Sequence, residues 1–230
     1  MTQGAGVNRS AHQRGFALPD LLAVLAVLVT LGAIAGIPLV RVRQRSQKVT
    51  CAGNLGVVGR ALLLYAQDSR SQLPGPVPGQ RDVWWGYKDL IQSYVKKGLE
   101  ASSAETVFVC PRDRGYSDPV PFSQSARFGM SSYVFNGVSI PGVPSISGWN
   151  LGAIAEPKRT LLVMEWAAHA PLSWHRSRTG KANAPFYKDA ECVVGFVDGR
   201  AAETRIYYDG FNAAYTRDPI AGYDYRFSGN

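Results

Sequence analysis

The chain has 230 residues, with 25 Lys and Arg against 17 Asp and Glu and a formal net charge of +8. Hydrophobic residues make up 46% and charged residues 18%, which excludes a disordered polyelectrolyte and allows a packed core. Three cysteines are too few for a disulfide scaffold, and three histidines exclude a His-rich metal cage. We therefore expect one folded domain with an appendage.

The positive charge is concentrated on the two sides of one apolar segment. From Val49 onward the chain carries 19 basic and 16 acidic residues, so the body of the protein is nearly neutral. Nucleic-acid binding needs a basic patch on the folded domain, and we therefore expect no nucleic-acid partner. The basic residues that precede Val49 are Arg9, Arg14, Arg41, Arg43, Arg45 and Lys48.

The apolar segment Leu21–Val40 predicts a single helix that spans the lipid bilayer. Its 20 residues carry no charge, and as a helix they extend about 30 Å, the thickness of a bilayer core. The four basic residues between Arg41 and Lys48 are suited to binding lipid headgroups. By the positive-inside rule, they favour a cytoplasmic position for the body of the protein.

The residues from Arg14 to Asp20, RGFALPD, resemble a type IV prepilin signal. The resemblance implies cleavage after Gly15 by a prepilin peptidase and N-methylation of Phe16. It also implies that Asp20 pairs with the amino terminus of a neighbouring subunit, and that the following domain lies outside the cytoplasmic membrane, in contrast to the charge argument.

The match to the prepilin signal departs from the usual pattern at three positions. Ala17, Pro19 and Asp20 stand where Thr, Ile or Val, and Glu are usual. Proline is acceptable in a first helical turn, and Asp20 keeps a negative charge near the helix N-terminus. Two alternatives stay open: a secretory signal cleaved after Ala33-Ile34-Ala35, and a plain anchor without processing.

An amphipathic helix is predicted to follow the apolar segment and to run to about Asp68. Its apolar stripe has spacings of four and three residues. Gly53, Gly56 and Gly59 lower the helix propensity and suggest close packing against the body. The stripe comprises Cys51, Leu55, Val58, Leu62 and Tyr65.

Short elements are predicted after a loop at 74–79. We expect a helix at 87–97, strands at 107–109, 133–136 and 160–165, and a β-hairpin of 192–197 and 200–207. The hairpin turns at Asp198-Gly199, a strong turn sequence. We expect the aromatic tail after Asp209 to cover the sheet without forming further strands.

Several short sequence motifs resemble segments in the heads of bacterial pseudopilin-like proteins. They include CAGNL at 51–55, YAQD at 65–68, LP at 73–74, FVCPRD at 108–113 and FVDG at 196–199. Such heads carry a His ten residues before the Asp of Asp-Gly, but this chain has Lys188 there. The implied fold class is α+β: a long N-terminal helix packed on a small antiparallel-sheet head with long loops.

The cysteines predict a disulfide between Cys51 and Cys110, with Cys192 as a buried thiol. Cys51 lies on the apolar stripe about 16 Å beyond Val40, clear of the lipid, and Cys110 ends a short apolar run. An oxidising compartment outside the membrane would let the pair form. Three separate buried thiols are the alternative.

No enzymatic or metal-binding motif is evident in the sequence. Glu165, His169 and His175 do not have zinc-motif spacing, so we expect no metal and no cofactor. Calcium is an open alternative, because some pseudopilin heads bind it through C-terminal carboxylates. The carboxylates considered are Asp198, Asp209, Asp218 and Asp224.

The sequence therefore predicts a structural subunit of a type IV pilus-like or type II secretion pseudopilus-like assembly. It would be single-pass in the cytoplasmic membrane, with the lipid bilayer, prepilin peptidase and other pilin-like subunits as partners. A membrane-tethered extracytoplasmic binding module or hydrolase is the alternative. The predicted parts are a leader at 1–15, a transmembrane and filament-core helix at 16–40, an amphipathic helix at 41–73, and a head at 74–230.

Overall fold

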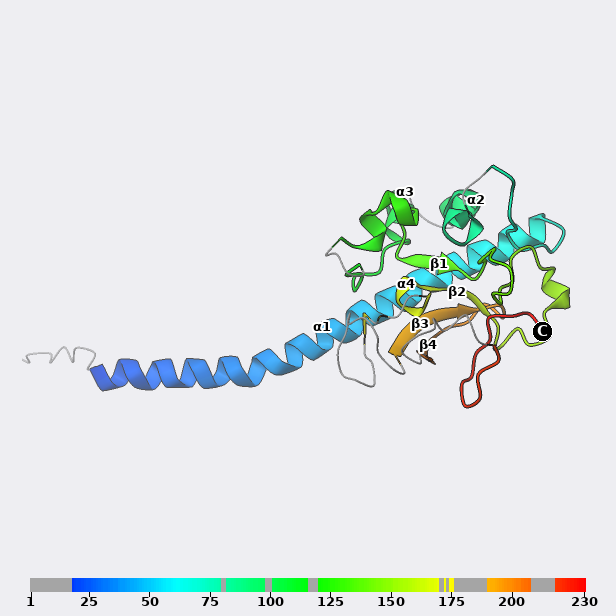
Figure 1. Cartoon of the computed structure of the whole chain (residues 1–230). Helices are drawn as coiled ribbons and strands as arrows, with labels where there is room; N and C mark the ends of the chain where they lie inside the picture. The colour runs from blue at the N-terminus through cyan, green and yellow to red at the C-terminus, as the bar shows by residue number, and fades with distance from the viewer. Residues whose placement is uncertain are drawn as a thin grey trace, which may run out of the picture. The chain divides into compact units, whose positions relative to one another are not determined.

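The computed structural model describes residues 18–79, 82–97, 101–115, 120–169, 172, 174–175, 190–207 and 218–230. The chain divides into two compact units, Met1–Gln44 and Arg45–Asn230, which we call the N-terminal and C-terminal units. The N-terminal unit is described from Leu18 onward and consists there of one helix. The C-terminal unit combines helices with one four-stranded antiparallel sheet, so the fold class is α+β (Figure 1).

Helix α1 spans Leu18–Asp68 and is 51 residues long. Within the C-terminal unit, its predicted stripe is confirmed at four positions, Cys51, Leu55, Val58 and Leu62, all of which are fully buried. The fifth, Tyr65, is half-buried. The helix ends at Asp68 as expected, and Arg70 and Ser71 follow with positive φ angles of 57° and 64°.

The sheet has the strand order β1-β2-β3-β4, and all neighbouring strands are antiparallel. The predicted hairpin is confirmed as β3 and β4, which turn at Asp198-Gly199. Gly199 has a φ of 90°, a conformation that glycine adopts without strain. The strands are β1 (Tyr133–Phe135), β2 (Leu161–Glu165), β3 (Ala190–Phe196) and β4 (Ala201–Ile206).

One face of the sheet packs against the C-terminal half of α1. A Cβ atom added to Gly195 of β3 would lie 2.8 Å from Leu55 Cδ2, so the absence of a side chain there lets the helix approach the strand. A Cβ on Gly59 would be in ordinary contact with Val163 of β2, whereas Gly53 has nothing within 4 Å. The expected close packing therefore holds for Gly59 and is wrong for Gly53.

Aromatic side chains from the C-terminal segment pack on the core. Tyr225 and Phe227 are buried, and Tyr223, Tyr225 and Phe227 form a series of edge-to-face ring contacts. Within the described residues 218–230 there is no strand, only an isolated bridge from Arg226 to Thr160. Over residues 218–230 the aromatic tail packs on the core without forming a strand, as the sequence predicts, while the part of the tail before Asp218 lies outside the described residues.

The segment between α1 and the sheet differs from expectation in two places. Helix α2 spans Val83–Lys97, so it begins four residues before the predicted start at Tyr87. The predicted strand at 107–109 is wrong, because Phe108 and Val109 donate backbone hydrogen bonds to the carbonyls of Glu105 and Thr106 and close a local turn. This turn follows α3, Ala101–Thr106, which we did not predict.

The described residues contain four further short helices. Three are 3₁₀-helices: η1 (Phe122–Gln124), η2 (Ala126–Phe128) and η3 (Leu151–Ala153). The fourth is α4 (Trp166–His169), which directly follows β2. Phe122, Phe128 and Trp166 make mutual ring contacts, with Phe122 stacked on Trp166 at 5.2 Å between centroids. Trp166 and Trp174 are both buried and belong to the core.

Three buried tyrosines predict a loss of stability at alkaline pH. Burial raises the pKa of Tyr87, Tyr133 and Tyr225 above the usual value, and Glu165 adds to the shift at Tyr133. The phenols therefore ionise first in the unfolded chain, so the stability they contribute is present below about pH 10 and is lost as the pH rises above it. Each adds a slope of up to about 1.4 kcal/mol per pH unit.

We expect Tyr133→Phe to reduce the slope of the free energy of unfolding against pH by about a third in the alkaline range, because two of the three phenols remain. Urea unfolding of the full chain in detergent, followed by tryptophan fluorescence from about pH 9 to pH 11, measures this slope. Equal slopes for the two proteins would contradict the assignment.

Candidate functional site

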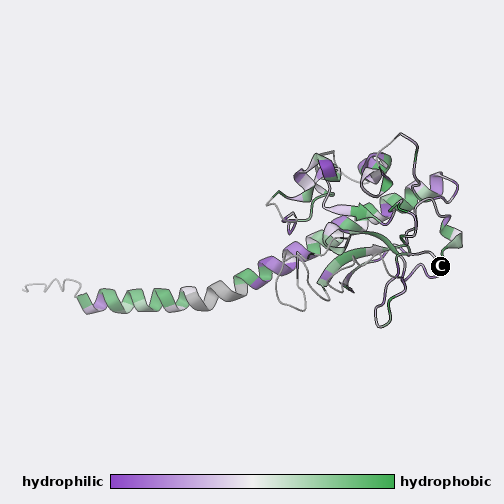
Figure 2. Ribbon diagram, in the orientation of Figure 1, coloured by the Kyte–Doolittle hydropathy of each residue, from purple (hydrophilic) through white to green (hydrophobic). Residues whose placement is uncertain are grey.

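The first part of α1 exposes apolar side chains on all of its sides. From Leu18 to Gly32 every described residue is exposed, and the six leucines in this stretch are between 57% and 75% exposed. Figure 2 shows this part of the helix as almost continuously hydrophobic. Isolated apolar residues on a surface are ordinary, but a helix that is apolar all round needs lipid or other helices to cover it.

The described residues include one helix that is long and apolar enough to cross a membrane. By length and composition this stretch is Leu39–Asp68 of α1, within which an 18-residue window has a mean hydropathy of 1.4 and is 39% buried. Its buried residues, among them Cys51 and Leu55, belong to the core of the C-terminal unit. The chemistry of a span therefore suits Leu21–Val40 better, where the described side chains are exposed.

The predicted assembly residue, Asp20, lies at the start of this helix. Asp20 is exposed in the first turn of α1, where its negative charge is favoured by the helix dipole. Gly15 and Phe16 lie outside the described residues.

Cys51 and Cys110 form a disulfide in the structure, the pair expected from the sequence. The bond joins α1 to the turn after α3 and closes a separation of 59 residues. Both cysteines are buried, as is the thiol of Cys192, which lies on β3 outside the disulfide. Tyr133 on β1 donates a hydrogen bond to the carbonyl of Cys51 at 3.2 Å, so the sheet also holds this point of the helix.

A buried carboxylate and a buried imidazole lie directly beside the disulfide. Glu165 Oε1 is 2.9 Å from His175 Nε2 and 3.3 Å from Cys110 Sγ. The Glu165 side chain is fully buried and that of His175 is 3% exposed. Glu165 and Tyr133 are paired across β2 and β1, and therefore face α1 together. We call Cys51, Cys110, Glu165 and His175 the buried cluster.

The loop around Cys110 is fixed by the carboxylate of Asp113. Its two oxygens accept hydrogen bonds from the backbone N–H groups of Gly115, Phe122 and Ser123 and from the hydroxyl of Ser132. The neighbouring Arg112 donates two hydrogen bonds to the carbonyl of Trp174, the residue before His175. These contacts hold Cys110 and the segment of His175 beside Glu165 without contributing ligands themselves.

The sequence identified Glu165 and His175 as residues of types that bind metal ions, but it did not connect them with the cysteines. The structure brings these four together, whereas the side chain of His169 lies outside the described residues. One signal was available: Glu165 is the only charged residue in the otherwise apolar strand LLVME. A carboxylate in a fully buried strand requires polar partners.

The C-terminal carboxylates considered for calcium are engaged separately in the described residues. Asp218 accepts hydrogen bonds from Phe227 N and from the backbone and hydroxyl of Ser228, and Asp224 pairs with Arg159. Asp198 pairs with Arg200, while Asp209 lies outside the described residues. None of the three described carboxylates forms part of the buried cluster.

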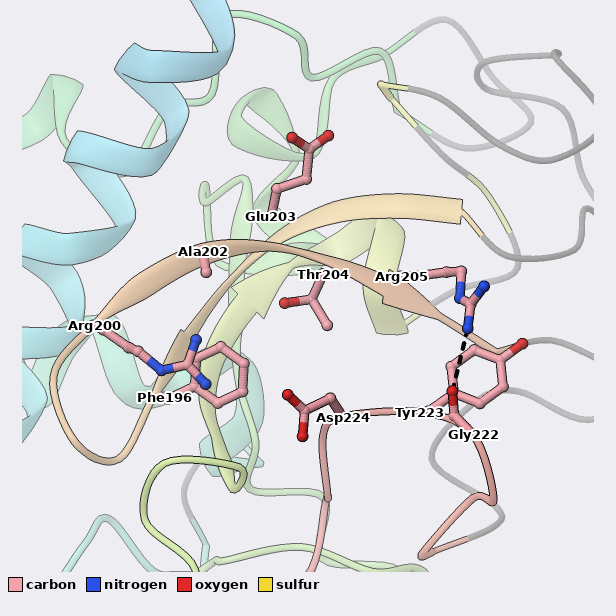
Figure 3. A pocket seen from close by; sticks show the side chains of 9 residues that line it. All are labelled: Phe196, Arg200, Ala202, Glu203, Thr204, Arg205, Gly222, Tyr223 and Asp224. Carbon is pink, nitrogen blue, oxygen red and sulfur yellow. Dashed lines mark hydrogen bonds between the residues drawn. The ribbon is translucent and has the colours of Figure 1, made fainter.

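A shallow hollow of about 260 Å³ lies beside β4. Figure 3 shows Arg200 at one end, stacked on Phe196 with 3.6 Å between the guanidinium carbon and the ring centre, and Arg205 at the other end bonded to the carbonyl of Gly222. Glu203 and Asp224 also line it, so the formal charges cancel. The hollow favours neither an anion nor a cation.

Comparisons with protein-family models, with curated proteins and with solved structures give no match for this chain.

Proposed function

We propose that the protein is a membrane-anchored, pilin-like structural subunit that assembles through the apolar part of α1. The observation that carries the proposal is the run of exposed apolar side chains from Leu18 onward. Exposing these side chains to water is unfavourable, because the burial of each CH₂ group contributes about 0.8 kcal/mol of stabilisation. A bilayer covers them in the stored subunit, and neighbouring helices cover them in an assembly.

The disulfide supports a position of the C-terminal unit outside the cytoplasm. Structural disulfides persist in oxidising compartments and are rare in the reducing cytoplasm. A disulfide between Cys51 and Cys110 therefore agrees with the topology that the prepilin-like signal implies. This argument for a position outside the cytoplasm outweighs the small excess of basic residues after the apolar segment, which favours a cytoplasmic position.

Asp20 supplies the specific interaction between subunits in this proposal. It lies in the first helical turn, five residues after the proposed cut. Pairing with the new amino terminus of a neighbour neutralises two charges that are each costly in lipid. The assembly is then held by apolar packing and placed in register by one ion pair.

Intact mass and N-terminal sequencing of the membrane-extracted protein test the processing step. We expect a chain that begins at N-methylated Phe16. A start at Gly36 would support the secretory alternative, and an intact Met1 would support the plain anchor. Either outcome would overturn the prepilin-like proposal.

The variant Asp20→Ala tests the assembly step. We expect membrane insertion to be unchanged and the share of subunits cross-linked to pilin-type helices to fall roughly tenfold or more, because the neighbour's amino terminus loses its partner. Asp20→Glu is the matched control, since it keeps the charge and should assemble normally. Equal cross-linking of all three proteins would favour a tethered module that does not polymerise.

A further inference from the structure

We propose that the buried cluster is a redox-gated zinc site. In the oxidised protein Cys51 and Cys110 form the disulfide. In the reduced protein the two sulfurs, Glu165 Oε1 and His175 Nε2 bind one Zn²⁺ ion. The proposal concerns the C-terminal unit alone and is independent of whether the chain assembles.

The geometry of the four groups fits one ion. Their nearest ligand atoms all lie within 4.8 Å of one another, and all four residues are buried or nearly so. Zinc bonds of about 2.0–2.3 Å in a tetrahedron leave ligand atoms about 3.3–3.8 Å apart. The two sulfurs are bonded to each other and must move apart most, and breaking their bond permits this.

The approach of Glu165 to Cys110 places an oxygen ligand beside a sulfur ligand. Glu165 Oε1 and Cys110 Sγ lie 3.3 Å apart, which is ordinary van der Waals contact in the oxidised protein. This separation also suits two ligands of one zinc ion in tetrahedral coordination. In the reduced protein, a cation between a carboxylate and a thiolate would make this approach favourable.

The surrounding hydrogen bonds hold the donor atoms as a metal site requires. Val193 N donates to Glu165 Oε2 at 2.8 Å, which leaves Oε1 directed at His175 and Cys110. The backbone N–H of Arg112 lies 3.4 Å from Cys110 Sγ and donates to the sulfur. Such outer hydrogen bonds orient metal ligands and adjust their basicity.

The donor types select zinc rather than calcium or magnesium. Two thiolates, one imidazole and one carboxylate form a soft set that suits Zn²⁺ in tetrahedral coordination. The ligands carry three negative charges and the ion two positive ones, so the site has a net charge of −1. The empty reduced site with two neutral thiols carries the same charge, so exchanging the two thiol protons for Zn²⁺ adds no buried charge.

The change of state balances with a dithiol as reductant. Thiol–disulfide exchange breaks the S–S bond, forms two S–H bonds in the protein and converts the dithiol to its disulfide, a transfer of two electrons and two protons. Zn²⁺ then replaces the two thiol protons, which pass to solvent. Glu165 binds as the carboxylate and His175 as the neutral imidazole.

Both states attach α1 to the rest of the C-terminal unit at the same point. The disulfide joins Cys51 to Cys110, whereas zinc would join Cys51 to Cys110, to Glu165 on β2 and to His175. We therefore expect zinc to preserve the fold of the reduced protein. Oxidation would release the ion as the sulfurs bond.

The test uses the full chain in detergent, unfolded and reduced with a phosphine, then refolded with Zn²⁺ or with a chelator. We expect one zinc per reduced chain by elemental analysis and less than about a tenth of that in the oxidised chain. Zinc at about 100 times its Kd should raise the Tm of the reduced protein by roughly 5–10 °C. Co²⁺ in place of zinc should give a thiolate-to-metal charge-transfer band.

Variants separate this site from adventitious binding to thiols. Glu165→Gln and His175→Gln should each weaken zinc binding by more than about 100-fold, beyond the loss caused by removing an outer hydrogen-bond partner. Cys192→Ala, which removes the thiol outside the cluster, should bind as the original chain does. Absence of zinc from the reduced chain, equal zinc in the oxidised chain, or unchanged binding by Glu165→Gln and His175→Gln would each overturn the proposal.

Discussion

Replacing Cys51 and Cys110 together with alanine is expected to lower the free energy of unfolding of the C-terminal unit by about 4 kcal/mol. The disulfide joins residues 59 apart in sequence, and closing so long a loop removes much conformational entropy from the unfolded chain. Urea unfolding of the full chain in detergent, with a chelator present, measures the loss. The measurement is made on oxidised protein, so that the original chain carries the bond.

Cys192→Ala is the matched control for the disulfide variant. It also removes a buried sulfur, but no covalent bond, so we expect a loss of about 1 kcal/mol from packing alone. In the reduced, zinc-free original chain, the stability should fall to that of the double variant. A double variant as stable as Cys192→Ala would show that the loop-closure argument fails here.

Leu55→Ala is expected to lower the free energy of unfolding by about 3–4 kcal/mol. Leu55 is fully buried on α1, and its Cδ2 fills the space left by the missing side chain of Gly195 on β3. Truncation leaves a cavity between a helix and a strand that are both held in place, so the site can collapse only partly. Thermal and urea unfolding, monitored by tryptophan fluorescence, give the difference.

Leu64→Ala on the same helix provides the comparison. Leu64 is 48% exposed, so the same chemical change removes little buried surface and should alter the stability by less than about 0.5 kcal/mol. The contrast tests whether the helix lies on the sheet through the predicted stripe. Similar losses at positions 55 and 64 would contradict that packing.

The parts of the fold that were predictable from sequence depend on short-range pattern. The stripe from Cys51 to Leu62 requires only helical periodicity, and the β3–β4 hairpin requires two apolar runs around Asp198-Gly199. The end of α1 at Asp68 follows from the loss of that periodicity. Each signal lies within a few turns or residues of the element it predicts.

The sequence-based predictions fail where the structure depends on contacts between residues that are distant in the sequence. The apolar run at Phe108 and Val109 has strand composition, but α3 before it and the contact of Asn54 with the Val109 carbonyl fix it as a turn. The buried cluster unites residues from α1, a turn, β2 and a loop. No spacing rule links Cys51 with His175, because the topology of the sheet decides their proximity.

The position of the disulfide determines how the protein responds to mechanical tension. Among the residues of α1 whose burial is described, Cys51 is the first that is fully buried, so a pull on the preceding helix reaches a covalent bond before it reaches the apolar contacts of Leu55 and Leu62. The enclosed residues cannot extend while the bond is intact, which shortens the stretched chain by about 200 Å. Optical-tweezers extension before and after reduction would reveal this difference. In the proposed filament, such a subunit would pass load from α1 to the turn at Cys110 without unfolding the residues between the two cysteines.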